Sequence, residues 1–199
     1  MDRIEKNSTQ KSLLVFAEIE SLNKGENLIN EYEEFLSLVK SSEVEVLDSL
    51  KFKQRTPVTS TFISSGKLES IKDLPMLGKV DLIIINHQLS ASQNRNLEKY
   101  FNKRVIDKTE LILDIFASRA TSHIGKLQVE LAQLNHLSTR LIRGWTHLER
   151  QKGGIGLRGP GETQLETDRR LISKRIKRLN YRLSKAHKQR EINRYSRKK

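Results

Sequence analysis

The run Val80-Asp81-Leu82-Ile83-Ile84-Ile85-Asn86 decides the fold class of this 199-residue chain. It is nearly continuous in apolar residues, a pattern typical of a strand that is covered on both faces in a parallel sheet. Just after it, Ser90 and Gln93 have the spacing of a capping box, which predicts a helix over residues 90–101. Residues 104–106 follow as a last short strand. This part of the chain therefore reads as a strand-helix-strand unit.

Upstream of this run the same alternation recurs. Residues 13–19 and 43–50 are predicted strands, and residues 26–39 form a helical pattern between them. Strands that alternate with helices indicate an α/β fold. We expect residues 1–107 to form an α/β subdomain, a small, mostly parallel sheet with flanking helices.

From Thr109 onward the hydrophobic period becomes that of a helix. Apolar residues recur at steps of three, four or seven on both sides of residue 152. The first seam comprises Leu127, Leu131, Leu134, Leu141, Trp145 and Leu148, and the second comprises Leu165, Ile172, Ile176, Leu179, Leu183 and Ala186. Thr163 and Glu166 have capping-box spacing at the start of the second helix. Residues 108–199 are therefore predicted to form a long antiparallel two-helix hairpin.

The tip of this hairpin is a glycine-rich loop over residues 152–162. Half of the ten glycines of the chain lie within nine positions, in Gly153-Gly154-Ile155-Gly156-Leu157-Arg158-Gly159-Pro160-Gly161. A turn needs one or two glycines, so five favour a loop whose backbone comes close to another surface. Exposed backbone N–H groups next to Arg158 suit phosphate and ribose recognition.

The charge of the chain indicates the chemistry of that surface. Residues 1–107 carry 15 Lys/Arg and 16 Asp/Glu, whereas residues 108–199 carry 22 and 8, so nearly all of the net charge of +13 lies in the hairpin. Residues 169–199 hold 14 basic side chains and one acid, Glu191. Charge of one sign along a helix repels itself unless a polyanion neutralises it, so nucleic acid is the first candidate partner.

The composition of the chain excludes several classes of protein and of binding site. The chain has no cysteine, which excludes a disulfide framework, thiolate metal sites and cysteine nucleophiles. The five histidines form no pair with acids at metal-ligand spacing, so no metal site is predicted. No run approaches the roughly 20 apolar residues of a membrane span, and the short apolar run near the start lacks the features of a signal peptide. We expect a cytoplasmic protein.

Three patterns resemble catalytic motifs but lack the required context. Residues 154–159 satisfy G-x-G-x-x-G, yet a polar helix end precedes them where a dinucleotide site needs a strand. Ser65-Gly66-Lys67-Leu68 lacks the first glycine and the final Ser or Thr of a phosphate-binding P-loop. Asp107 and Glu110 have the spacing of helix capping, which is a simpler explanation than acid–base chemistry. No catalytic residue is predicted.

Several longer stretches resemble the N-terminal region of the HflX family of ribosome-associated GTPases. The most specific are Gly125-Lys126-Leu127-Gln128-Val129-Glu130-Leu131-Ala132-Gln133-Leu134, Gln151-Lys152-Gly153-Gly154-Ile155-Gly156 and Gly159-Pro160-Gly161-Glu162-Thr163-Gln164-Leu165-Glu166-Thr167-Asp168-Arg169-Arg170. The resemblance is strongest over residues 89–172. It implies an α/β subdomain followed by a two-helix subdomain, in agreement with the periodicity.

The resemblance also implies a function. Such proteins bind the large ribosomal subunit, their loop reaches toward the peptidyl-transferase centre, and a GTPase domain that follows is used to split or rescue ribosomes. The implied rRNA contacts are Gly153, Gly154, Gly156, Arg158, Gly159, Gly161, Glu162 and Gln164. The charge of the second helix adds Arg169, Arg170, Arg175 and Arg178. The sequence ends before a P-loop strand would begin, so GTP and Mg²⁺ are expected in the absent G domain, and no cofactor or enzyme activity is expected of these residues.

Two alternatives remain open. The α/β half could bind and hydrolyse a nucleotide by itself, although no catalytic constellation supports this. The two helices could instead form a coiled-coil adaptor that recruits a protein, and its binding would then be insensitive to salt and to RNase.

Overall fold

The computed structural model describes the backbone of residues 10–22, 28–151 and 164–196, and the side chains within 10–22, 30–140 and 166–195. The chain divides into two compact units, Met1–Ile112 and Leu113–Lys199. Helix α4 (Lys108–Arg119) runs across this division. None of the described helices has the length and apolar character needed to cross a membrane.

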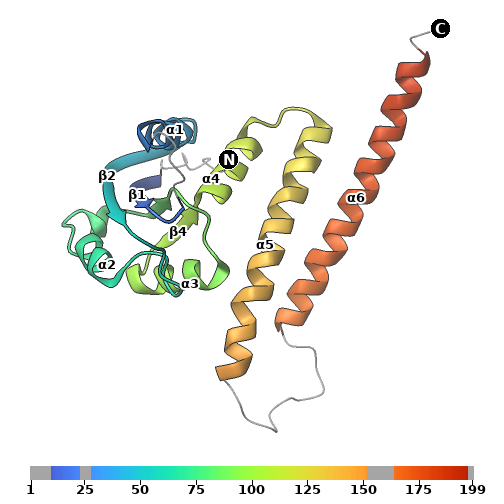
Figure 1. Cartoon of the computed structure of the whole chain (residues 1–199). Coiled ribbons are helices and arrows are strands. Elements are labelled where there is room, and N and C mark those ends of the chain that lie inside the picture. Colours follow the sequence, from blue (N-terminus) through green and yellow to red (C-terminus); the bar gives the residue numbers. More distant parts are fainter. Residues whose placement is uncertain (1–9, 23–27, 152–163, 197–199) are drawn as a thin grey trace, which may run out of the picture. The chain divides into compact units, whose positions relative to one another are not determined.

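A four-stranded parallel sheet forms the centre of the first unit (Figure 1). Its strands are β1 (Gln10–Ile19), β2 (Val44–Gln54), β3 (Leu82–Ile85) and β4 (Arg104–Asp107). In the order β2-β1-β3-β4, strands β1 and β3 are central and strands β2 and β4 lie at the edges. The chain therefore adds β2 on one side of β1, and β3 and β4 on the other. All four residues of β3 are buried, as the apolar run predicts, and the predicted small parallel sheet with flanking helices is confirmed.

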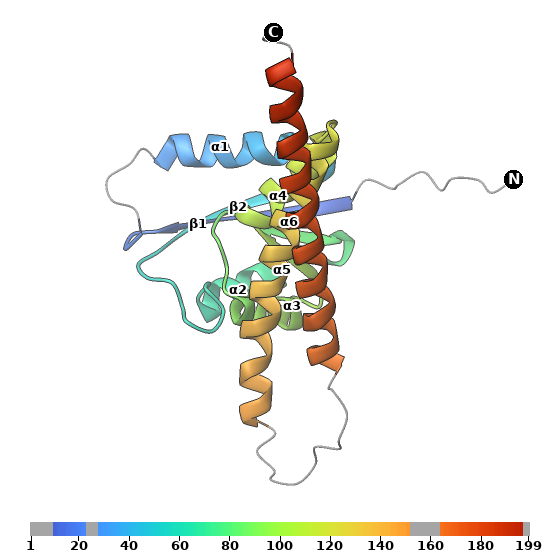
Figure 2. The ribbon, with the colours of Figure 1, turned by 90° about the vertical axis from the view of Figure 1, so that its right-hand side faces the viewer.

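The two faces of the sheet are covered by different helices, α1 (Leu28–Lys40) on one face and α2 (Ser65–Lys72) and α3 (Ala91–Phe101) on the other (Figure 2). Successive side chains of a strand point to opposite faces. Leu13 and Val15 accordingly share one core cluster with residues of α2 and α3. Phe16 contacts Phe35 of α1, with their ring centroids 6.1 Å apart. A short 3-10 helix, η1 (Leu77–Lys79), precedes β3.

The capping box predicted for α3 is present. The Ser90 Oγ accepts the Gln93 backbone N–H, and the Gln93 side chain accepts the Ser90 backbone N–H. Two otherwise unpaired backbone donors are thereby satisfied at the helix start.

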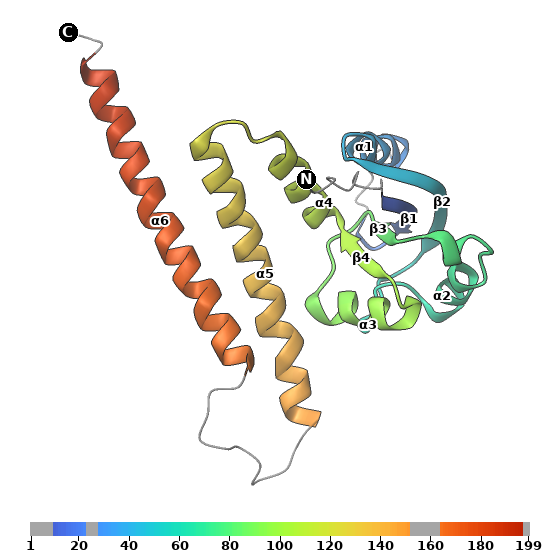
Figure 3. The same ribbon diagram turned by 180° about the vertical axis from the view of Figure 1, so that it is seen from behind.

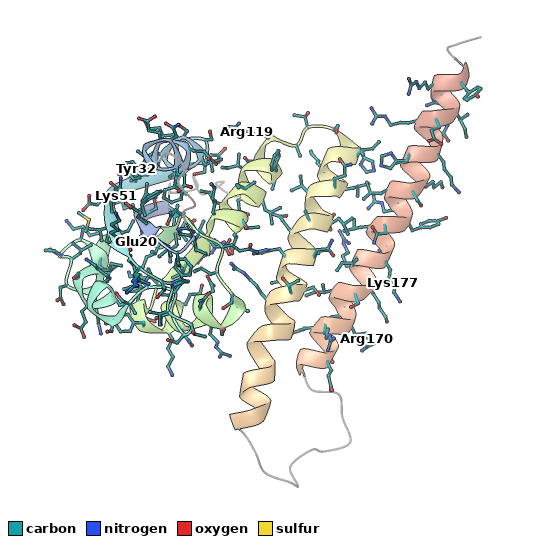
Figure 4. The ribbon with its side chains drawn as sticks, in the orientation of Figure 1. Glu20, Tyr32, Lys51, Arg119, Arg170 and Lys177 are labelled. Carbon is teal, nitrogen blue, oxygen red and sulfur yellow. The ribbon has the colours of Figure 1, made fainter. Side chains whose placement is uncertain are left out.

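Strand β2 is longer than predicted, because it continues to Gln54. Its second half alternates Leu50 and Phe52, which pack on the core, with exposed Lys51 and Lys53. The Lys51 ammonium lies over the Tyr32 ring, 5.2 Å from its centroid (Figure 4). The edge of a sheet tolerates such lysines, and because they are polar the sequence does not show that the strand continues.

In the second unit, α4 ends at Arg119 and a new helix, α5 (His123–Gln151), begins after a break that the sequence analysis missed. The Ser122 Oγ accepts the Gly125 backbone N–H at 3.0 Å and caps α5. A Cβ at Gly125 would lie 2.8 Å from that hydroxyl oxygen, so glycine fits this cap without displacing it.

Helices α5 and α6 (Gln164–Ser196) form the predicted antiparallel hairpin (Figure 3). Leu127, Leu179 and Leu183 form its buried cluster. Ile124, Leu131 and Leu134 are partly buried and pack against it. The seam residues Leu141, Trp145, Leu148 and Leu165 lie outside the described side chains.

Candidate nucleic-acid interface

The candidate interface is assigned to the hairpin, and the structure describes part of it. The loop over residues 152–162, with Gly153, Gly154, Gly156, Arg158, Gly159, Gly161 and Glu162, lies outside the described residues. Gln164 begins α6, and its side chain also lies outside the described set. The four predicted arginines of α6 are all described.

Helix α6 presents a strongly basic surface. Residues 164–196 hold 11 Lys/Arg and 3 Asp/Glu. Arg169, Arg170 and Arg178 are exposed. Arg170 and Lys177 lie in the half of α6 nearer its start (Figure 4). Because only 3 acids share this helix with 11 bases, its own acids cannot neutralise the surface.

Arg175 differs from the other three predicted arginines. Its Nε donates to the Glu130 Oε1 of α5 at 2.7 Å, and its Nη2 donates to the same oxygen. The pair joins the two helices beside the leucine cluster. Arg175 therefore has a structural role in the hairpin, whatever else it contacts.

A second stripe on α6 was missed by the sequence analysis. Its members are spaced by three, four or seven residues, so they share one helix face. Counted at 3.6 residues per turn, that face is opposite to Leu179 and Leu183. We call it the outer stripe, and it consists of Arg170, Lys174, Lys177, Tyr181, Lys188 and Tyr195. The same period search, applied to exposed positions, would have found it.

At the carboxyl edge of the sheet, polar side chains bond to the protein's own backbone. The Asn86 Oδ1 accepts the Ala17 backbone N–H at 2.8 Å, and its Nδ2 donates to the Ala17 carbonyl at 3.2 Å. The His87 Nε2 donates to the same carbonyl at 2.7 Å. Burial lowers the pKa of His87, against the opposing effect of this hydrogen bond. Asn86 and His87 thus continue the pairing of β1 with β3.

Asp107 and Lys67 also have structural partners. The buried Asp107 carboxylate accepts the backbone N–H groups of Leu89 and Glu110, so the predicted capping is confirmed. Lys67, from the P-loop-like stretch, lies over the Phe52 ring at 5.7 Å. Among the described residues, no group of His, Asp or Glu side chains could hold a metal ion.

Comparison with known protein families assigns both units. Residues 30–117 match the family model described as "GTP-binding GTPase N-terminal", and residues 119–197 match "GTP-binding GTPase Middle Region". These are successive regions of one class of protein, the GTP-binding GTPases.

Relatives in that class narrow the assignment. The GTPase HflX of Escherichia coli K12 is 54% identical over 169 residues, which cover 85% of this chain and 40% of the relative. The GTPase HflX of Caldanaerobacter subterraneus is 40% identical over 198 residues, which cover 100% and 46%. The chain belongs to the HflX family and matches its N-terminal part. It spans less than half the length of these relatives.

Solved structures agree with this fold. A GTP-binding protein from Sulfolobus solfataricus, crystallised with GDP, superposes with a TM-score of 0.61 at 23% identity, over 89% of this chain and 46% of that one. The G235P variant of the protein called SsGBP superposes with a TM-score of 0.52 at 28% identity, over 67% and 41%.

Proposed function

We propose that this chain is a ribosome-binding part of an HflX-like GTPase, which docks on rRNA of the large subunit through the basic surface of α6. The observation that carries the proposal is that surface, with 11 basic and 3 acidic residues over 164–196. A polyanion removes the like-charge repulsion of such a helix, and release of counterions from the phosphates supplies affinity. Family membership supports the part of the proposal that names an HflX-like GTPase.

The glycine-rich loop at 152–162 has a separate role in this proposal. It extends toward the peptidyl-transferase centre and contacts rRNA there, while α6 supplies most of the attachment. Joined to its G domain, the chain then helps to split or rescue ribosomes. GTP and Mg²⁺ belong to that G domain, and the protein acts in the cytoplasm.

The test is co-sedimentation of the chain with isolated large subunits, small subunits and intact ribosomes across a salt series. We expect salt-sensitive binding that is selective for large subunits. Reversal of Arg169, Arg170 and Arg178 to Glu removes up to three phosphate contacts, so the slope of log K against log salt should fall by about 2 to 3. Arg175 is left intact because of its pair with Glu130.

A matched variant controls for net charge. Lys40, Lys79 and Lys99 are exposed in the first unit, and their reversal to Glu changes the net charge by the same amount. This variant should bind as the unaltered chain does. Equal losses of affinity in both variants would show that overall net charge, and not the surface of α6, determines binding. Binding that is insensitive to salt and to RNase would contradict the proposal and indicate a protein partner.

A further inference from the structure

Helix α6 exposes large apolar and aromatic side chains along with its charges. Tyr181 is 69% exposed and Tyr195 is 79% exposed. Both are members of the outer stripe, opposite to the leucine seam. Neither ring contributes to the described hairpin core, so both are available to a ligand of α6.

The spacing of the two rings limits what they can bind. Tyr181 and Tyr195 are 14 positions apart, or about 21 Å along the helix at a rise of 1.5 Å per residue. They are too far apart to enclose one planar group between them. Each is therefore a separate platform, with Lys188 on the same stripe between them.

We infer that the outer stripe of α6 recognises unpaired RNA, with one base stacked on Tyr181, another on Tyr195, and phosphates held by Lys174, Lys177 and Lys188. This inference rests on the proposed function, which makes RNA the partner of α6. It adds that the RNA contacted here is a single strand or a loop. In an A-form duplex the bases are stacked inside the helix, whereas an unpaired base offers its face to an aromatic ring.

Charge and aromaticity together favour this ligand over a protein. A protein partner for so basic a stripe would have to supply acidic side chains for the lysines and separate apolar or aromatic side chains for the tyrosines. Unpaired RNA supplies both features, since each nucleotide has a phosphate for a lysine and a base for a ring.

The experiment uses fluorescence anisotropy with two labelled probes, a 12-nucleotide oligouridylate and a 12-base-pair RNA duplex. The whole chain is compared with Tyr181→Ala, Tyr195→Ala and their double variant. Stacking contributes about 1–3 kcal/mol per base, so each alanine should weaken oligouridylate binding roughly 5- to 150-fold. Duplex binding and the salt slope should stay the same, because a tyrosine carries no charge.

Two further variants keep the result interpretable. Tyr181→Phe with Tyr195→Phe preserves both rings and should bind the single strand as the unaltered chain does. Phe116→Ala removes a ring that is 59% exposed on α4 and should have no effect. Circular dichroism checks that the helices persist in every variant.

Alanine variants that bind oligouridylate as tightly as the unaltered chain would overturn the inference, as would an unaltered chain that binds neither probe at low salt. The proposed function fails separately. Tyrosine-dependent binding of oligouridylate without salt-sensitive binding to large subunits would refute docking on the ribosome and retain stacking. Docking on large subunits that needs the arginines but not the tyrosines would retain the proposed function and refute stacking.

Discussion

The pairing of α5 with α6 should depend strongly on one leucine. Leu179 is 1% exposed and lies in the cluster with Leu127 and Leu183. Leu→Ala in a core costs about 2–5 kcal/mol, depending on how far the surroundings close the cavity. Two helices joined by a loop can move closer to each other and partly close the cavity. We therefore expect Leu179→Ala to lower the free energy of unfolding by about 2–3 kcal/mol, in the lower half of that range.

The assay is urea unfolding followed by tryptophan fluorescence. Trp145 is the only tryptophan and lies in α5, so its signal reports on the second unit. The matched control is Leu171→Ala, the same chemical change on the same helix at a position that is 55% exposed. Surface changes of this kind stay within about 0.5 kcal/mol. Equal unfolding midpoints for the two variants would refute the assignment of Leu179 to a packed seam.

Three other predictions test separate contacts. Arg175→Glu alone should lower the stability of the hairpin by about 0.2–1 kcal/mol, because the pair is partly exposed, and Arg175→Glu with Glu130→Arg should restore it in the same urea assay. Asn86→Ala leaves the Ala17 N–H without its partner and should cost the first unit about 1–3 kcal/mol in urea unfolding followed by circular dichroism; no change would show that water replaces the amide. Burial lowers the pKa of His87 in the folded state. When the pH falls below the ordinary pKa of histidine, the unfolded state therefore binds a proton that the folded state does not. Stability of the first unit should therefore fall in that range, and an unfolding midpoint in His87→Gln with the same pH dependence would contradict this origin.

The sequence predicted those features that a short segment determines by itself. The apolar run of β3 must be covered on both faces, and the Ser90 cap needs only its own helix, so both predictions were confirmed. The predicted end of β2 was wrong, because Lys51 and Lys53 make the second half of the strand look polar. An edge strand tolerates such lysines, and strand order is not visible in the sequence.

Some features depend on partners that are distant in the chain. Arg175 looks like any other base in α6, and only the folded hairpin brings it to Glu130, 45 positions away. Asn86 was read as the end of a strand, and its pairing with Ala17 requires β1 and β3 to be neighbours. Tyr181 and Tyr195 are visible in the sequence, but their shared face is defined only relative to the apolar seam on the opposite side of α6.

The two faces of α6 place opposite demands on the same helix. Its inner face contributes Leu179 and Leu183 to a small buried cluster, while its basic residues repel one another. Among the described side chains, three leucines form the buried cluster, and folded domains are only marginally stable, so this repulsion is a considerable cost to the hairpin. A ligand that binds only the folded hairpin stabilises it by about 2.7 kcal/mol at 100 times its dissociation constant, which is comparable to the contribution expected of Leu179. Phosphates bound along α6 would relieve its like-charge repulsion, so docking on RNA would stabilise the hairpin to the extent that RNA binds the folded helices more tightly than the unfolded chain.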